Sequence, residues 1–174
     1  MRVKGYLTQK KLEQLLKNIS GIKWLGNELP VPNSKRRRWD MAFKLGSKTF
    51  IVEYDGDEHY RNSLKIKTDN EKDEAARKLD YKVIRVPYWI QIDSKMLYHY
   101  FGIKEKIQQD FPHGFISTKI FPASFCEKGV ERFRKELEKL PINVKNKVIQ
   151  SLKARVKEYG VDYVLPSSLQ SNLS

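Results

Sequence analysis

The sequence predicts an α/β domain in which a mixed sheet is flanked by helices and followed by C-terminal helices. Two observations lead to this fold class. Residues 35–56 alternate apolar and polar side chains on both sides of Gly46 and Ser47, a pattern typical of a β-hairpin. Several other segments repeat apolar residues at helical spacing. Because 174 residues with 40% hydrophobic content can bury one core, we expect one domain.

The N-terminal part is expected to form a helix and a strand. Thr8 can cap a helix that ends near Gly21 and whose apolar positions share one face: Leu12, Leu15, Leu16 and Ile19. Lys23 to Leu29 is a strand candidate that leads through a turn-rich stretch into the hairpin.

The remaining chain alternates helical and extended patterns. In order, we expect helix 69–79, strand 81–86, helix 94–109, strand 115–121, and helices 127–140 and 144–159 separated by Pro141. The expected domain is 1–166, with a core of about 8–110, a C-terminal strand and helical extension of about 111–166, and a flexible tail at 167–174.

The hairpin register can be derived from its loop. A two-residue Gly46-Ser47 loop places Leu45 opposite Lys48, and the same register places Asp40 opposite Glu53. Asp55 then lies one pleat further along, on the face of Glu53. The opposite face is wholly apolar in this register, with the facing pairs Trp39 and Tyr54, Met41 and Val52, and Phe43 and Phe50.

Three carboxylates so close together repel one another. Like charges that face each other cost a sheet roughly 0.2–1 kcal/mol per pair. Mg²⁺ takes oxygen ligands, typically one or two carboxylates with waters and substrate phosphates, so Asp40, Glu53 and Asp55 are candidate metal ligands. The alternative is an edge at which the acids are solvated or paired with Arg36 and Arg38 on the same face.

These residues resemble the core motif of the PD-(D/E)xK nucleases, in which acids on two neighbouring strands hold Mg²⁺ for phosphodiester hydrolysis. The branch most similar is the family related to very-short-patch repair endonucleases. In this family an acid on one strand is followed by E-x-D-G and a histidine on the next, then by Asp with a basic residue three positions on, and then by V-I-R. The chain matches these positions in order between about Arg36 and Pro87, with Asp40, Glu53, Asp55, Gly56, His59, Asp69, Lys72, Val83, Ile84 and Arg85.

The resemblance implies a restriction endonuclease-like core and assigns roles to four residues. Asp40, Glu53 and Asp55 would bind Mg²⁺, with Mn²⁺ able to substitute, and His59 would transfer a proton near the leaving oxygen. A lone histidine after a strand is also a common structural or exposed residue. The chain departs from the family at Asp80, where Gly is frequent, and at Asp55, where the superfamily has its catalytic Lys.

The charge balance points to a polyanion. Lys and Arg number 34 against 21 Asp and Glu, which gives a formal charge of +13 spread over the chain. The run Lys35, Arg36, Arg37 and Arg38 precedes Asp40 directly, and we expect it to contact DNA phosphates near the cut. A solvated or localisation-type basic run is the alternative.

The composition restricts the environment of the chain. Cys126 is the one cysteine, so neither an intramolecular disulfide nor a cysteine-based zinc site can form. We expect no membrane span, no signal peptide and a cytoplasmic protein.

Two functions fit the sequence. The first is a Mg²⁺-dependent endonuclease acting on double-stranded DNA, of restriction, homing or repair-nicking type. The second is a non-catalytic DNA- or RNA-binding module that retains the nuclease fold. Cutting both strands favours a homodimer, whereas a nicking monomer has the same sequence features.

Overall fold

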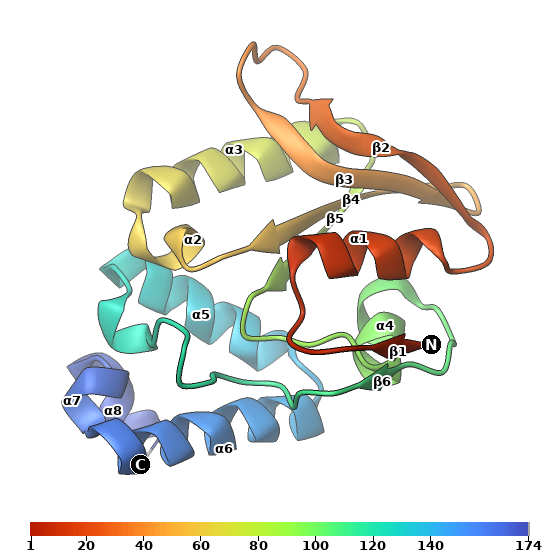
Figure 1. The fold of residues 1–174 in the computed structure, drawn as a ribbon. Helices are drawn as coiled ribbons and strands as arrows, with labels where there is room; N and C mark the ends of the chain where they lie inside the picture. Colours follow the sequence, from red (N-terminus) through yellow and green to blue (C-terminus); the bar gives the residue numbers. More distant parts are fainter. Residues whose placement is uncertain (174) are drawn as a thin grey trace.

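A computed structural model describes residues 1–173. Its main sheet has four strands in the order β2 (Ile22–Pro30), β3 (Arg38–Leu45), β4 (Lys48–Asp55) and β5 (Lys82–Pro87) (Figure 1). The first two pairings are antiparallel and the pairing of β4 with β5 is parallel. The fold is therefore mixed α/β, as predicted.

The hairpin has the predicted register. Met41 pairs with Val52, and the ladder continues to Leu45 opposite Lys48. Gly46 adopts a left-handed φ of 59°, which a residue without a Cβ tolerates in a tight turn. One predicted pair is wrong, because the β3–β4 ladder ends at Met41 opposite Val52 and Trp39 packs with Ala42 and Ile51 on the other face of the sheet.

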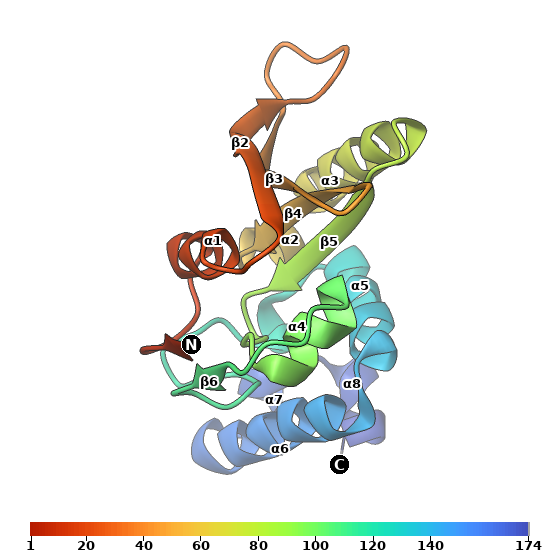
Figure 2. The ribbon, with the colours of Figure 1, turned by 90° about the vertical axis from the view of Figure 1, so that its right-hand side faces the viewer.

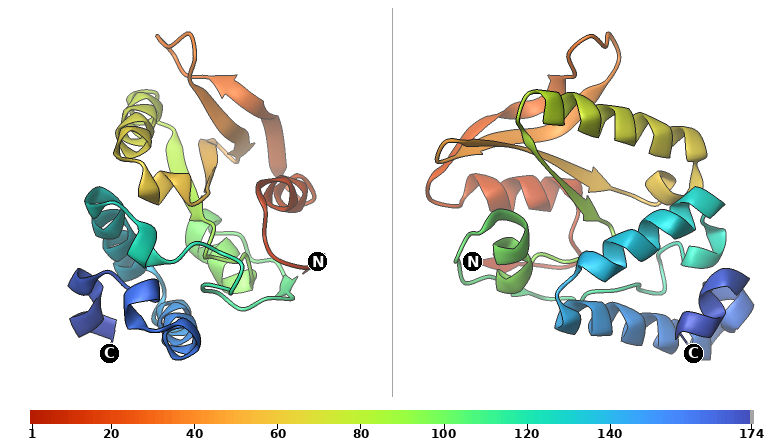
Figure 3. Two further views of the ribbon diagram at one scale, coloured as in Figure 1. Left: turned by 60° about the vertical axis from the view of Figure 1, so that its left-hand side comes forward. Right: turned by 180° about the vertical axis from the view of Figure 1, so that it is seen from behind.

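Helices cover both faces of the sheet. The helix α3 (Ser63–Lys78) lies on one face over a small apolar cluster that includes Trp39, Ala42 and Ile51. On the other face lie α1 (Gln9–Lys17), α4 (Ser94–Phe101), α5 (Glu127–Lys139) and α6 (Ile142–Tyr159), around the main core (Figures 2 and 3). The shorter elements are β1 (Arg2–Val3), α2 (Glu58–Arg61), β6 (Gln108–Gln109), a 3₁₀ turn at Pro122–Ser124, α7 (Val161–Val164) and α8 (Ser167–Leu173).

Helix boundaries follow local capping chemistry. The hydroxyl of Thr8 accepts a hydrogen bond from the Lys11 amide at 3.3 Å, as the capping prediction requires. Helix α3 begins earlier than residue 69 because the side chain of Asn62 accepts from two backbone amides. Helix α4 stops at Phe101, well before residue 109, because Gly102 takes a left-handed φ of 70°.

Two further expectations for the C-terminal part are wrong. Residues 115–121 form no strand; they run as irregular backbone that buries Phe115 and Phe121 in the main core. The tail forms α8, which packs Leu169 into the same core, while Ser174 lies outside the described residues. No helix of the described chain is both long and apolar enough for a membrane crossing.

The loop between β2 and β3 extends away from the layers of the fold. Figures 1 and 2 show it projecting beyond the sheet and α3, and it carries the basic run. We call residues 31–37 the basic arm. Its position separates most of the basic run from the packed core.

Helix α5 approaches α2 closely at a glycine. The Cys126 amide donates to the Tyr60 carbonyl at 3.1 Å, and a Cβ added at Gly129 would overlap that carbonyl oxygen. Only glycine fits this contact, and the contact fixes the position of α5 relative to α2, which follows β4.

We expect Gly129→Ala to lower the free energy of unfolding by roughly 3 kcal/mol or more, because neither backbone can move without disturbing the packing. Gly46→Ala is the control. Its Cβ meets nothing within 4 Å, so only the left-handed conformation is strained, at about 1 kcal/mol. Urea unfolding of both variants measures the difference, and equal losses would show that α5 does not depend on Gly129.

Candidate functional site

The strands β3 and β4 separate at Asp40, and side chains replace the missing ladder bonds. The Asp40 amide donates to Oε1 of Glu53 at 3.1 Å, and the Tyr54 amide donates to Oδ2 of Asp40 at 2.9 Å. Asp40 and Glu53 are thus brought together at the C-terminal end of β4. We call them the Asp40–Glu53 pair.

Lys72 of α3 completes this pair. Its Nζ lies 2.5 Å from Oε2 of Glu53, and both side chains are buried. Burial and the charge of Asp40 nevertheless raise the pKa of Glu53 to about 7, although Lys72 and Arg85 favour the ionised form. When both carboxylates are ionised, the ammonium group of Lys72 offsets one of the two negative charges of the pair.

Asp55 belongs to a second group of charges. Its carboxylate accepts from the guanidinium of Arg85 at 2.7 Å, and it also contacts Arg132 of α5. Asp69 of α3 accepts from the same Arg132 at 2.8 Å. Asp55 and Asp69 are almost fully buried, at 0% and 1% exposure, so they depend on these guanidinium groups, which also pair with Asp73 and Glu136.

His59 of α2 lies between the two aspartates. Its Nδ1 is 2.6 Å from Oδ2 of Asp69 and 3.1 Å from Oδ1 of Asp55, so Nδ1 carries the hydrogen. Burial alone would raise the pKa of Asp69, but His59 and the two arginines outweigh it and hold that pKa at about 2. We call Asp55, His59, Asp69, Arg85 and Arg132 the Asp–His cluster.

The three predicted metal ligands do not form one group. In the described chain, the group of three metal-ligating residues whose ligand atoms lie within 4.8 Å of one another is Asp55, His59 and Asp69. Asp55 joins His59 because Arg85 and Arg132 hold it there, whereas Asp40 and Glu53 meet at the strand separation. Two carboxylate sites therefore follow one another along β4.

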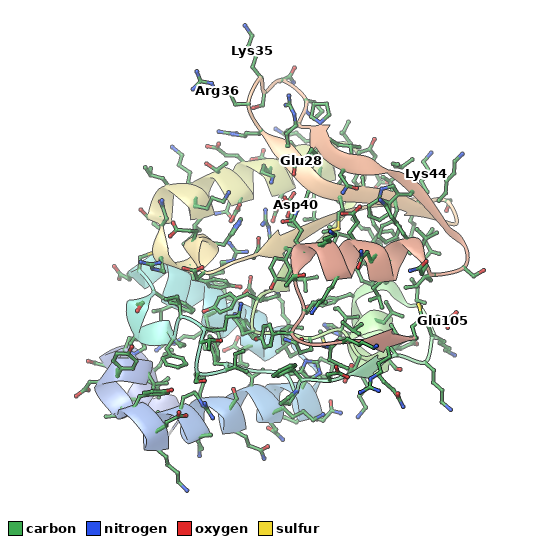
Figure 4. The ribbon with its side chains drawn as sticks, viewed as in Figure 1. Glu28, Lys35, Arg36, Asp40, Lys44 and Glu105 are labelled. Carbon is green, nitrogen blue, oxygen red and sulfur yellow. The ribbon has the colours of Figure 1, made fainter. Side chains whose placement is uncertain are left out.

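The basic run occupies the basic arm and the start of β3. Lys35 and Arg36 lie at its tip, away from Asp40 (Figure 4). Arg37 pairs with Glu71 of α3, and Arg38 donates to the Arg37 carbonyl at 3.0 Å. Ion pairs of Arg36 and Arg38 with the hairpin acids, the alternative to a metal site, are not found among the described residues.

Four contributors lie outside the site residues predicted from the sequence: Asp69, Lys72, Arg85 and Arg132. The first three stand in the family string but were given no role. Lys72 had a usable signal, because α3 buries Ile66, Asp69, Lys72 and Ala76 at helical spacing, and charged residues within a buried stripe indicate partners. No sequence pattern indicated Arg132, because it contacts Asp55 from a position 77 residues further along the chain. The chain matches no family model, no curated protein and no solved structure.

We expect Arg132→Met to destabilise the fold by about 3–5 kcal/mol, because it leaves Asp55 and Asp69 with uncompensated buried charge. The control is Lys135→Met on the same helix. Lys135 pairs with Glu131 at the exposed surface, so its loss should change stability little. Urea unfolding at neutral pH compares the two variants, and an equally small effect for both would argue against neutralisation by Arg132.

The raised pKa of Glu53 predicts the pH dependence of stability. A carboxyl group whose pKa is higher in the folded state favours folding at low pH and loses this contribution between its unfolded value of 4.5 and about 7. The full contribution is about 3 kcal/mol. Metal-free Glu53→Gln should therefore lose less stability than the wild type between pH 5 and pH 8.

Thermal unfolding across this pH range measures the effect. Glu74→Gln serves as the control, because Glu74 is exposed on α3 and pairs with Lys78. Identical pH profiles for Glu53→Gln and the wild type would contradict the raised pKa.

Proposed function

We propose that this chain is a Mg²⁺-dependent DNA endonuclease built on a restriction endonuclease-like core. The observation that carries the proposal is the meeting of Asp40, Glu53 and Lys72 where β3 and β4 separate. Carboxylates and a lysine at this position are the groups that metal-assisted phosphodiester hydrolysis needs.

The Asp40–Glu53 pair suits Mg²⁺ or Mn²⁺. It offers carboxylate oxygens with unused lone pairs, and the lysine in contact with Glu53 matches one of the two formal negative charges. When bound, such an ion lowers the pKa of a coordinated water and offsets the charge that develops on the scissile phosphate. Asp40 and Glu53 would hold it there together.

Lys72 supplies the basic group that the sequence lacks beside Glu53. It comes from α3 and not from β4, and the buried contact with Glu53 fixes its ammonium group. In this position Lys72 would orient the attacking water or donate to a phosphate oxygen. We therefore assign to Lys72 the place of the superfamily lysine that Asp55 occupies in the sequence.

His59 is assigned proton transfer, with Asp55 and Asp69 as positioning residues. Because Nδ1 donates to the two carboxylates, Nε2 is left to exchange a proton with the reacting oxygens. Arg85 and Arg132 keep the aspartates in place. Asp55 thus orients His59 in this proposal and is not a third metal ligand.

The substrate proposed is double-stranded DNA. The basic arm continues directly into β3, so Arg36 lies four residues from Asp40 and within at most about 14 Å of chain. Phosphates within a few base pairs of the scissile bond would then contact the arm. Such contacts position the duplex without reading its sequence.

The second candidate is a nucleic-acid-binding module without turnover. The charge balance of the Asp–His cluster favours it, because Arg85 and Arg132 already neutralise Asp55 and Asp69 as a purely structural network would. In a third arrangement, an ion replaces the Nδ1 proton and is held by Asp55, His59 and Asp69. The experiment below separates the three.

We expect the purified protein to nick or cut supercoiled plasmid DNA in millimolar Mg²⁺ and to stop when a chelator is added. Glu53→Gln should abolish cleavage and metal binding, measured by Mn²⁺ titration, while salt-sensitive DNA binding survives. His59→Ala should slow cleavage by roughly 100-fold or more and leave Mn²⁺ binding intact.

Glu74→Gln, which removes an exposed acid from α3, should cut at the wild-type rate. Loss of Mn²⁺ binding in His59→Ala but not in Glu53→Gln would move the ion to the Asp–His cluster. A wild type that binds duplex DNA but cuts no DNA form in Mg²⁺ or Mn²⁺ would establish the binding module.

A further inference from the structure

A groove lies at the end of the sheet opposite the Asp40–Glu53 pair. It has a volume of about 980 Å³ and is formed by the turn between β3 and β4, the start of β5, helix α4 and the start of α6. We call it the α4 groove and define it by Lys48, Lys82, Lys95, Tyr98 and His99. None of these residues belongs to the site described above.

The α4 groove is basic. Lys48, Lys82 and Lys95 are exposed and form no ion pair with the described residues, and no Asp or Glu is among the described residues that line the groove. Three ammonium groups around one concavity repel one another. An anionic ligand would relieve that repulsion and gain charge-assisted hydrogen bonds.

An exposed aromatic ring accompanies the lysines. Tyr98 of α4 is 55% exposed, although its neighbours Met96 and Leu97 on the same helix are fully buried. The ammonium group of Lys104 lies over the Tyr98 ring, 5.9 Å from its centroid, and adds a further cation to this surface. An exposed aromatic ring beside lysines is typical of surfaces that bind unpaired bases and their phosphates.

The groove borders the proposed active site through a second cavity. His99 and Tyr100 line both the α4 groove and a cavity of about 600 Å³ that Asp69, Arg85 and Arg132 also line. Along β4, Lys48 precedes Glu53 by five residues, which corresponds to about 17 Å. A strand of several nucleotides would cover this distance.

We propose that the α4 groove binds a single-stranded segment of nucleic acid, with phosphates on Lys48, Lys82 and Lys95 and an unpaired base on Tyr98. The proposal rests on the proposed function for its class of ligand. A duplex fits less well, because its bases are stacked inside and cannot reach a tyrosine in a concavity. The segment would be the strand end or unpaired flank next to the cut.

The test measures binding of a fluorescent single-stranded oligonucleotide and of its duplex by anisotropy, in chelator, over a range of salt. The groove variant is the triple exchange Lys48→Gln, Lys82→Gln and Lys95→Gln. Its control, with the same change in charge, replaces three exposed lysines without ion pairs: Lys10→Gln, Lys153→Gln and Lys157→Gln.

For the single strand, the groove variant should lower the slope of log K against log salt by about 2, because roughly three phosphate contacts are lost. The control should leave this slope unchanged. Tyr98→Ala should weaken single-strand binding by about tenfold and affect the duplex little. Thermal unfolding checks that every variant is folded.

The proposal would be overturned if the two triple variants changed the salt slope of single-strand binding equally. It would also be overturned if Tyr98→Ala bound the single strand as the wild type does. Equal losses for single strand and duplex would likewise overturn it. Plasmid cleavage in Mg²⁺ keeps the two proposals apart: a chain that never cuts but loses single-strand binding through the groove retains the inference and rejects the nuclease.

Discussion

Neutralisation of two buried carboxylates is the constraint on which the arrangement of this molecule depends. Asp55 at the end of β4 and Asp69 on α3 have almost no contact with solvent, and a buried ionised group without partners costs several kcal/mol. Arg85 from β5 and Arg132 from α5 provide those partners. Four elements are thereby held around one point, and their relative positions determine where His59 and the proposed catalytic groups lie.

Two acidic residues of strand β4, Glu53 and Asp55, lie in different surroundings. Glu53 meets Asp40 where the ladder opens, and Lys72 only partly offsets their charge. One pleat further, Asp55 contacts Arg85 and Arg132 and lies 3.1 Å from Nδ1 of His59. Strand β4 thus separates an acid pair in contact with one lysine from a carboxylate that is enclosed by two guanidinium groups and a histidine.

The hairpin was predictable from the sequence because its pattern is local. Loop length and alternation determine the pairing of Met41 with Val52, and capping chemistry locates the start of α1. The grouping of Asp55 with His59 and Asp69 was not predictable in this way, since residues far along the chain decide where Asp55 points. Lys72 shows the intermediate case: the family string contains it, and its spacing from Ile66 and Ala76 fits the buried face of α3, but no local pattern names its partner.

The distance along the chain between Asp55 and Arg132 has a consequence for biosynthesis. Translation proceeds from the N-terminus, so the aspartates and Arg85 emerge from the ribosome before α5 exists. Until α5 docks through Gly129, Asp55 and Asp69 lack one of their two guanidinium partners, and His59 lacks its rigid support. A nascent chain would thus have the strands of its main sheet before the Asp–His cluster is complete. The cluster would be complete only after α5 has folded onto the sheet.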